Sequence, residues 1–266
     1  MIKEFAYNNV PVIYREFNPK GDALLVLLHG YLESSESFTP FVEHIDEHIR
    51  VLAIDLPGHG KSQVLPAEHS MRTMAEALQA LLESEKVQAC WLVGHSMGGY
   101  VALAFAKSYP KMVNGLCFLH SHPFADSDAV KEKRTREIAL VRQGKKELIA
   151  QSNIPNAFAV ESLENIRETV KGAIDIALQT PADGIIANLK AMMRRDDSHG
   201  FLKNWPKPFL LILGKKDNYI DYESLFDRLV LPERAIVVSL EKSGHMGFLE
   251  EPESVAEALE HFMQTD

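Results

Sequence analysis

The sequence predicts an α/β protein with a mostly parallel central sheet and helices on both faces. Uninterrupted apolar runs of strand length alternate with helical patterns, which is typical of strands that are buried on both sides. The chain has 266 residues, 46% hydrophobic and 24% charged, enough to bury a sizeable core. A single long helical segment interrupts the alternation. We therefore expect a core domain over 1–120 and 205–266, with a helical cap over 121–204.

The elements before residue 121 follow in regular order. Alternating polar and apolar residues over 5–17 predict a hairpin that turns at Asn8-Asn9. Ser70 is a good N-cap for one of the helices. Buried strands are predicted at 23–29, 50–56, 89–93 and 113–120, and helices at 36–49, at 70–86 and after Gly94.

Helical patterns cover most of 121–204. Helices are predicted at 127–144, 162–179 and 180–195, the last with Thr180 as N-cap, Pro181 at N1 and Asp183 at N3. Strands resume at 208–214 and 235–241, and a helix covers 252–264. Sites in such sheets lie outside the carboxyl ends of the strands. The helical segment leaves one of these ends, so we expect it to lie over the site as a lid.

Composition limits the partners. The net charge of −9 and the pI of about 5.7 argue against nucleic acid, because phosphate binding needs a basic face. We also expect no membrane partner, because no stretch approaches the ~20 apolar residues that a membrane span requires. Cys90 and Cys117 lie in or beside apolar runs, which predicts buried free thiols. Together with the absence of a signal-peptide pattern, this favours a cytoplasmic protein.

The stretch "GHSMGG" contains the strongest chemical signal. It fits G-x-S-x-G at a strand-to-helix junction, with Ser96 as the serine. Such a turn strains the backbone of the serine, so the residues two before and two after it must be small. Gly94 and Gly98 meet that need. The pattern therefore predicts that Ser96 is a nucleophile.

A serine nucleophile needs a base, and the base needs an acid to orient it. His245 in "KSGHMGF" follows the last strand, and Asp217 in "LLILGKKDNYID" follows the strand before it. Asp221 competes with Asp217 but reads better as an N-cap.

An oxyanion hole needs backbone N–H groups. We expect one from Met97, which directly follows the nucleophile and lies at a helix start. Tyr31 in "LLHGY" offers the second, and Gly30 lets that loop turn tightly.

With its order Ser96, Asp217, His245 and the motifs "LLHGY", "DLPGHGKS" and "GHSMGG", the chain resembles the α/β-hydrolase superfamily over nearly its whole length. Within it the chain looks like a serine carboxylesterase-type member with a helical cap. The resemblance implies that the segment after Asp55 is a structural turn without a catalytic role.

These residues predict a serine hydrolase that cleaves a small to medium carboxylic ester, or a related acyl compound, through an acyl-enzyme. The expected partner is a small-molecule acyl substrate, and no cofactor or metal is implied. Two alternatives stay open. One is a carbon–carbon bond hydrolase or lyase with the same triad, and the other is a non-enzymatic small-molecule receptor.

Other candidate residues receive structural interpretations. The loop "HSHPFADSD" contains His120, His122, Asp126 and Asp128, but nothing else has metal-ligand spacing, so we expect no metal site. His95 is expected to pack beneath the nucleophile turn. The following large side chains of the cap are expected to pack mostly against the core, with a few lining an acyl pocket: Phe158, Met192, Met193, Phe201 and Trp205.

Overall fold

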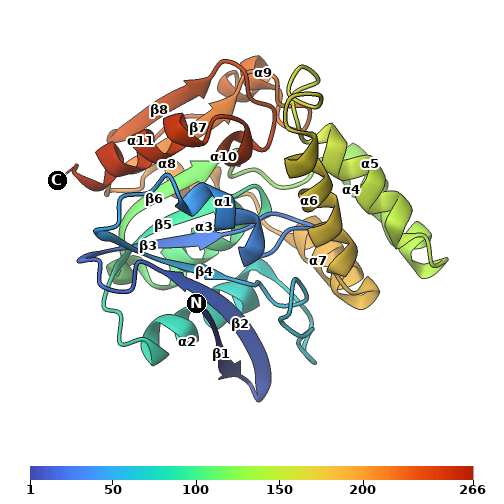
Figure 1. Cartoon of the computed structure of the whole chain (residues 1–266), viewed down its shortest axis with the longest axis horizontal. Helices are drawn as coiled ribbons and strands as arrows, with labels where there is room; N and C mark the ends of the chain where they lie inside the picture. Colours follow the sequence, from blue (N-terminus) through green and yellow to red (C-terminus); the bar gives the residue numbers. More distant parts are fainter. Residues whose placement is uncertain (266) are drawn as a thin grey trace.

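The computed structural model describes residues 1–265, and their strands form one eight-stranded sheet (Figure 1). The strand order is β1-β2-β4-β3-β5-β6-β7-β8. All neighbours from β4 through β3 to β8 pair in parallel, and only the β1–β2 and β2–β4 pairs are antiparallel. The predicted mostly parallel sheet is confirmed. The strands are β1 (Ile2–Tyr7), β2 (Val10–Phe17), β3 (Ala23–Leu28), β4 (Ile49–Ile54), β5 (Cys90–His95), β6 (Val113–Leu119), β7 (Phe209–Gly214) and β8 (Ala235–Leu240).

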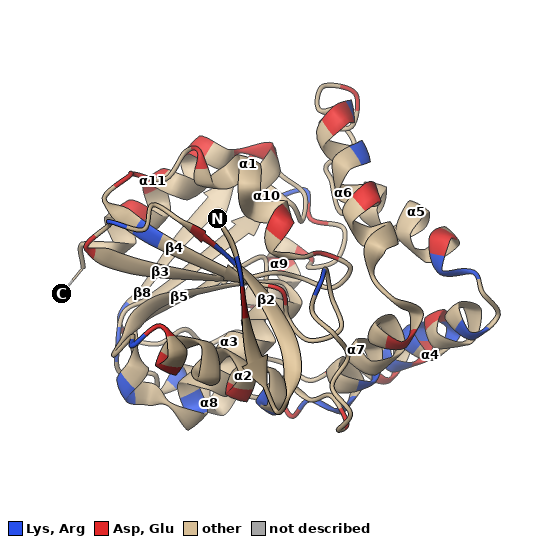
Figure 2. Ribbon diagram, turned by 60° about the horizontal axis from the view of Figure 1, so that its bottom comes forward, with Lys and Arg blue, Asp and Glu red and all other residues tan. Residues whose placement is uncertain are grey.

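Helices cover both faces of this sheet. Figure 2 shows α1, α10 and α11 on one face and α2, α3 and α8 on the other. The helices of the core are η1 (Ser35–Phe38), α1 (Thr39–Val42), α2 (Met71–Ser84), α3 (Met97–Ser108), η2 (Pro110–Met112), α9 (Tyr222–Phe226), α10 (Gly247–Glu250) and α11 (Pro252–Met263). Between β6 and β7 lie α4 (Asp128–Arg142), α5 (Lys146–Asn156), α6 (Arg167–Gln179), α7 (Ala182–Arg194) and α8 (His199–Lys203).

The N-terminal hairpin turns where the sequence predicts. Tyr7 pairs with Val10 across the two-residue turn, and both turn residues have positive φ, 52° at Asn8 and 62° at Asn9. Asparagine tolerates this conformation better than most residues, which is why the pair suits a tight hairpin.

The predicted helix over 36–49 is much shorter than expected. Only η1 and α1 are helical there, and the chain turns twice before β4, through hydrogen bonds from Ile45 N–H to Val42 O and from Ile49 N–H to Asp46 O. Ile45 and Ile49 are nevertheless buried. Loop residues that pack into the core reproduced the apolar spacing of a helix.

The predicted start of α7 is wrong by one residue. The helix begins at Ala182 with Pro181 as its N-cap, and no side chain caps it. Thr180 instead ends α6, and its hydroxyl is buried without a hydrogen-bond partner among residues 1–265. The short link between the two helices turns Thr180 inward, so it cannot reach the α7 N–H groups.

The inserted helices stand to one side of the sheet. Helix α4 packs against α7 and α5 against α6, and these four helices project beyond the sheet, whereas α8 returns to the core (Figure 2). Since they leave β6 and re-enter at β7, they belong to the strand ends where Ser96 lies.

Helix α7 is attached closely to the core. A Cβ at Gly184 would lie 2.2 Å from the carbonyl oxygen of Gly58 in the loop after β4. One turn later, the Asn188 amide donates to His59 Nδ1 at 3.1 Å, and its oxygen accepts from His69 Nδ1 at 3.0 Å. All three of these polar side chains are buried.

The structure also bears on the expectations for the two cysteines and for membrane-spanning segments. Cys90 and Cys117 are buried free thiols, as predicted. Within residues 1–265, no helix is both long enough and apolar enough to cross a membrane.

We predict that Gly184→Ala lowers the free energy of unfolding by about 1–3 kcal/mol, because the new methyl group collides with backbone that cannot move freely. Chemical denaturation measures the change. Gly172→Ala in α6 is the matched control. A Cβ there meets no atom within 4 Å, so better helix propensity should stabilise the protein by about 0.5–1 kcal/mol. Similar effects of the two substitutions would contradict the close α7 contact.

Candidate active site

Ser96 occupies a strained turn between β5 and α3. Its φ of 49° and ψ of −114° are unusual for a residue with a side chain. A Cβ at Gly94 would lie 2.4 Å from the carbonyl oxygen of Gly98, and one at Gly98 would lie 2.2 Å from that of Leu28. Only glycine fits at either position. The backbone is therefore packed as the elbow interpretation expects.

Two backbone N–H groups near this turn are free to bind a ligand. Within residues 1–265, neither the Tyr31 N–H nor the Met97 N–H donates a hydrogen bond to the protein. Met97 is the first residue of α3, where the helix dipole favours negative charge. Gly30 precedes Tyr31, and a Cβ at Gly30 would lie 2.4 Å from Glu33 Oε1, so the loop needs a glycine.

His245 and Asp217 lie in contact although they follow different strands. His245 Nδ1 donates to Asp217 Oδ2 at 2.7 Å. The other carboxylate oxygen of Asp217 accepts backbone N–H groups from Tyr219 at 2.7 Å and Ile220 at 2.9 Å. These bonds orient the carboxylate towards the imidazole.

Burial alone would raise the pKa of Asp217. The neighbouring His245, with hydrogen bonds from His120 and His245, outweighs burial and holds the pKa well below its usual range. The carboxylate is therefore ionised at neutral pH, as an acid that orients a base must be. Asp221, the competing candidate, instead caps α9 by accepting from Ser224 N–H at 2.8 Å.

His120 joins this group, although no sequence motif assigned it there. It directly follows β6 with a positive φ of 47°, and its Nδ1 lies 3.3 Å from Asp217 Oδ2. Burial lowers the pKa of His120 to about 4, so it is neutral at pH 7. The available signal was its position at a strand end, next to the strands that carry Ser96 and Asp217.

The other residues of the loop after β6 bind elsewhere. His122 Nδ1 accepts from Phe124 N–H at 3.2 Å, and its Nε2 lies 3.4 Å from Tyr100 Oη. Asp126 binds two arginines, Arg134 and Arg195. Within residues 1–265, the metal-type cluster is instead His120, Asp217 and His245, whose ligand atoms lie within 4.8 Å of one another. A metal ion there would have to displace the hydrogen bond between Asp217 and His245.

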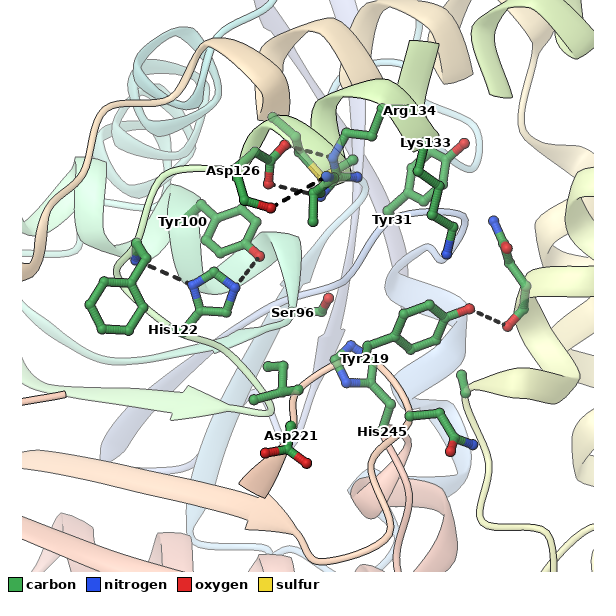
Figure 3. A pocket seen from close by; sticks show the side chains of 18 of the residues that line it. Tyr31, Ser96, Tyr100, His122, Asp126, Lys133, Arg134, Tyr219, Asp221 and His245 are labelled. Carbon is green, nitrogen blue, oxygen red and sulfur yellow. Dashed lines mark hydrogen bonds and ion pairs between the residues drawn. The ribbon is translucent and has the colours of Figure 1, made fainter. Parts of the chain in front are cut away.

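A cavity of about 670 Å³ opens above Ser96. Figure 3 shows Ser96 among the lining residues, with Tyr100 and His122 to one side and Tyr219 and His245 to the other. Within residues 1–265, no hydrogen bond joins the Ser96 hydroxyl to His245, and such contacts often tighten only when substrate binds. Charged residues also line the cavity: Glu33, Asp126, Lys133, Arg134, Glu137, Asp197, Asp221 and Arg228.

The large residues of the inserted segment divide between cavity and core. Met192 lines the cavity. Phe158 and Trp205 are buried, and neither is among the described residues that line it. Met193 and Phe201 are partly buried against the core.

The chain matches a family model described as the alpha/beta hydrolase fold over residues 23–136. A thermophilic esterase from Thermogutta terrifontis, solved with malate bound, superposes with a TM-score of 0.91 at 26% identity, over 99% of this chain and 98% of that one. The chain belongs to the α/β-hydrolase superfamily. It is an esterase-like enzyme of that superfamily.

Curated relatives agree with this grouping. A pimeloyl-[acyl-carrier protein] methyl ester esterase from Yersinia enterocolitica is 28% identical over 259 residues, which cover 95% of this chain and 97% of that protein. The Xanthomonas oryzae pv. oryzae protein of the same name is 27% identical over 249 residues, covering 90% and 94%. An enol-lactonase from Burkholderia xenovorans has a TM-score of 0.90 but 20% identity, with 99% and 100% coverage, and so shares the fold.

We predict that His122 makes the protein less stable in acid. Burial, with Arg195 nearby, lowers the pKa of His122 to about 3, whereas an unfolded histidine titrates near 6.5. Unfolding therefore takes up a proton between these pH values, and stability falls as pH decreases through that window. His122→Asn, which keeps an acceptor for Phe124 N–H, should reduce the pH slope of the unfolding free energy by about one proton.

Denaturation curves at several pH values between about 4 and 7 measure this slope. His48→Asn on the exposed surface controls for the replacement of a histidine by asparagine as such. A slope that changes equally in both variants would contradict the assignment to the His122 imidazole.

Proposed function

We propose that the chain is a serine hydrolase that cleaves carboxylic esters through an acyl-enzyme formed on Ser96. The 2.7 Å contact between His245 Nδ1 and Asp217 Oδ2 carries the proposal, because His245 shares a cavity with Ser96. Since Nδ1 donates to the carboxylate, Nε2 of the neutral ring is left to accept a proton.

In the proposed reaction, Ser96 Oγ attacks the ester carbonyl while His245 takes the hydroxyl proton. The N–H groups of Tyr31 and Met97 donate to the oxyanion as negative charge develops there. Collapse of the intermediate breaks the ester bond, and His245 passes its proton to the departing alkoxide. Water then attacks the acyl-enzyme with His245 as base, which releases the acid and restores Ser96.

We further assign residues 121–204 as a cap that selects substrates, with 1–120 and 205–266 as the catalytic core. Met192 of α7 supports this division, because it lines the cavity while Ser96, Asp217 and His245 all lie outside the segment. A cavity of about 670 Å³ lies within the usual range for small-molecule sites. Since the curated relatives are named for a pimeloyl methyl ester, monomethyl pimelate and its thioesters belong among the substrates to test.

The free thiols of Cys90 and Cys117 support a reducing, cytoplasmic compartment as the place of action.

We predict that Ser96→Ala lowers kcat for p-nitrophenyl esters at least about a thousandfold, because the nucleophile is lost. It should also abolish labelling by a fluorophosphonate probe. Asp217→Asn should lower kcat about a hundredfold or more, since the amide no longer stabilises the imidazolium.

Asp221→Asn is the matched control for the acid. It replaces a carboxylate that caps α9, so kcat should stay within about threefold of the wild-type value. Near-normal hydrolysis by Ser96→Ala would contradict the nucleophile assignment. An equal loss in the two aspartate variants would contradict the assignment of the acid.

We predict that Met192→Ala changes which acyl chain is preferred without removing activity. It enlarges the cavity, so kcat/KM should rise about 3- to 10-fold for long relative to short p-nitrophenyl esters, on the order of one to two methylene groups of binding energy. Acylation by p-nitrophenyl acetate should survive. Phe158→Ala, a buried residue outside the cavity lining, is the control for general loosening of the segment. The same loss for every chain length would contradict a selective cap.

A further inference from the structure

A buried carboxylate and a buried imidazole lie beneath the nucleophile turn. Glu33 is 5% exposed and His95 fully buried. His95 Nδ1 lies 3.0 Å from Glu33 Oε2, which also accepts the Gly30 N–H at 3.0 Å. On the other side of the ring, His95 Nε2 lies 2.8 Å from the backbone oxygen of His245.

The contacts and the directions of the two pKa shifts together indicate the charge of this pair. A carbonyl oxygen only accepts, so Nε2 of His95 must carry a proton, and Nδ1 faces a carboxylate. Burial alone would lower the pKa of His95, but Glu33 outweighs it and raises the pKa above its usual value. Burial would likewise raise the pKa of Glu33, and His95 outweighs it and lowers the pKa. The two groups therefore form a buried imidazolium–carboxylate pair.

Three segments of the proposed active site meet at this pair. Gly30 belongs to the loop that carries the Tyr31 N–H, and His95 directly precedes Ser96. His245 is held through its own backbone, since its N–H donates to Ala157 O at 2.6 Å while its carbonyl accepts from His95. The His95 and His245 rings lie 5.1 Å apart between centroids.

We propose that Glu33 and His95 are positioning residues that fix the oxyanion loop and the His245 loop relative to Ser96. The proposal rests on the proposed function, because it assigns those loops their catalytic roles. The proposed reaction uses neither side chain as nucleophile, acid or base. Their hydrogen bonds replace water, and the Glu33 carboxylate compensates a positive charge that would otherwise be costly to bury.

Three variants separate the parts of this network. His95→Asn places an amide near the position of Nδ1, but its side chain is too short to donate a hydrogen bond to the His245 backbone oxygen. His95→Gln extends to the Nε2 position and keeps a donor there. Glu33→Gln can still accept from Gly30 N–H and donate to a neutral His95, so it keeps the bonds but removes both charges.

We expect His95→Asn to lower kcat for p-nitrophenyl acetate about 10- to 100-fold with KM within about threefold, because the catalytic groups are bound but misplaced. His95→Gln should recover most of that loss. Circular dichroism and denaturation verify that each variant is folded. Wild-type kcat in folded His95→Asn, or equal loss in the two His95 variants, would overturn the proposal.

Glu33→Gln gives a readout that a merely structural role would not change. The charged and titratable groups around the His245 ring are Asp217, His95, His120 and Tyr219. His95 is the cation among them. Its Nε2 side faces the His245 backbone oxygen, whereas Glu33 lies on its Nδ1 side. Neutralising the pair therefore removes a positive charge on the side of His245, which makes His245 easier to protonate. The acid limb of kcat/KM should therefore move to higher pH, by about 0.3–1 unit, with kcat within about tenfold. An unmoved limb would contradict the ion pair.

Two measurements separate this inference from the proposed function. Fluorophosphonate labelling of the wild-type protein tests the Ser96 nucleophile without reference to Glu33 or His95. Nitrogen-15 NMR of histidine rings tests the pair without catalysis. At a pH above the ordinary histidine pKa of about 6.5, an imidazolium should still be present in the wild type and absent in Glu33→Gln. Its absence from the wild type would overturn the pair even if Ser96 is labelled.

Discussion

The strained turn at Ser96 is the constraint on which the rest of the site depends. A serine with φ of 49° between a buried strand and a helix is stable only if the surrounding backbone packs against it. Gly94 and Gly98 allow that packing, because the carbonyl groups of Gly98 and Leu28 occupy the space of any side chain. The same turn exposes the Ser96 side chain to the cavity and places the Met97 N–H at a helix start.

Buried histidines connect this turn to its neighbours. The rings of His95 and His120 both lie next to the ring of His245, yet their environments differ. A carboxylate pairs with His95 and keeps it charged, whereas burial dominates at His120 and keeps it neutral. Asp217 lies between the rings of His120 and His245. Because His120 stays neutral, the Asp217 carboxylate can stabilise the transient imidazolium of His245.

In the proposed function, the inserted helices add selectivity to a core that holds the three proposed catalytic residues. The Gly184 and Asn188 contacts tie α7 to the loop after β4, so Met192 on the same helix is held over the cavity. Through this attachment, a segment without any of the three proposed catalytic residues contributes Met192 to the lining of the cavity. The loop after Asp55 serves as the anchor, since its turn is held by hydrogen bonds from Ser35 and Lys61 N–H groups to the Asp55 carboxylate.

The sequence by itself determined the sheet class, the elbow and the pairing of Asp217 with His245, because these depend on local patterns and on the rule that parallel strands end at one edge. The sequence also favoured Asp217 over Asp221 as the acid of the triad, since Asp221 is placed to cap a helix. Tertiary structure alone decided that His120 approaches Asp217, that Glu33 binds His95, and that Thr180 turns away from α7. Burial and charge determine these contacts, and the residues involved lie far apart in the sequence or at a sharp turn. No local sequence pattern predicts them.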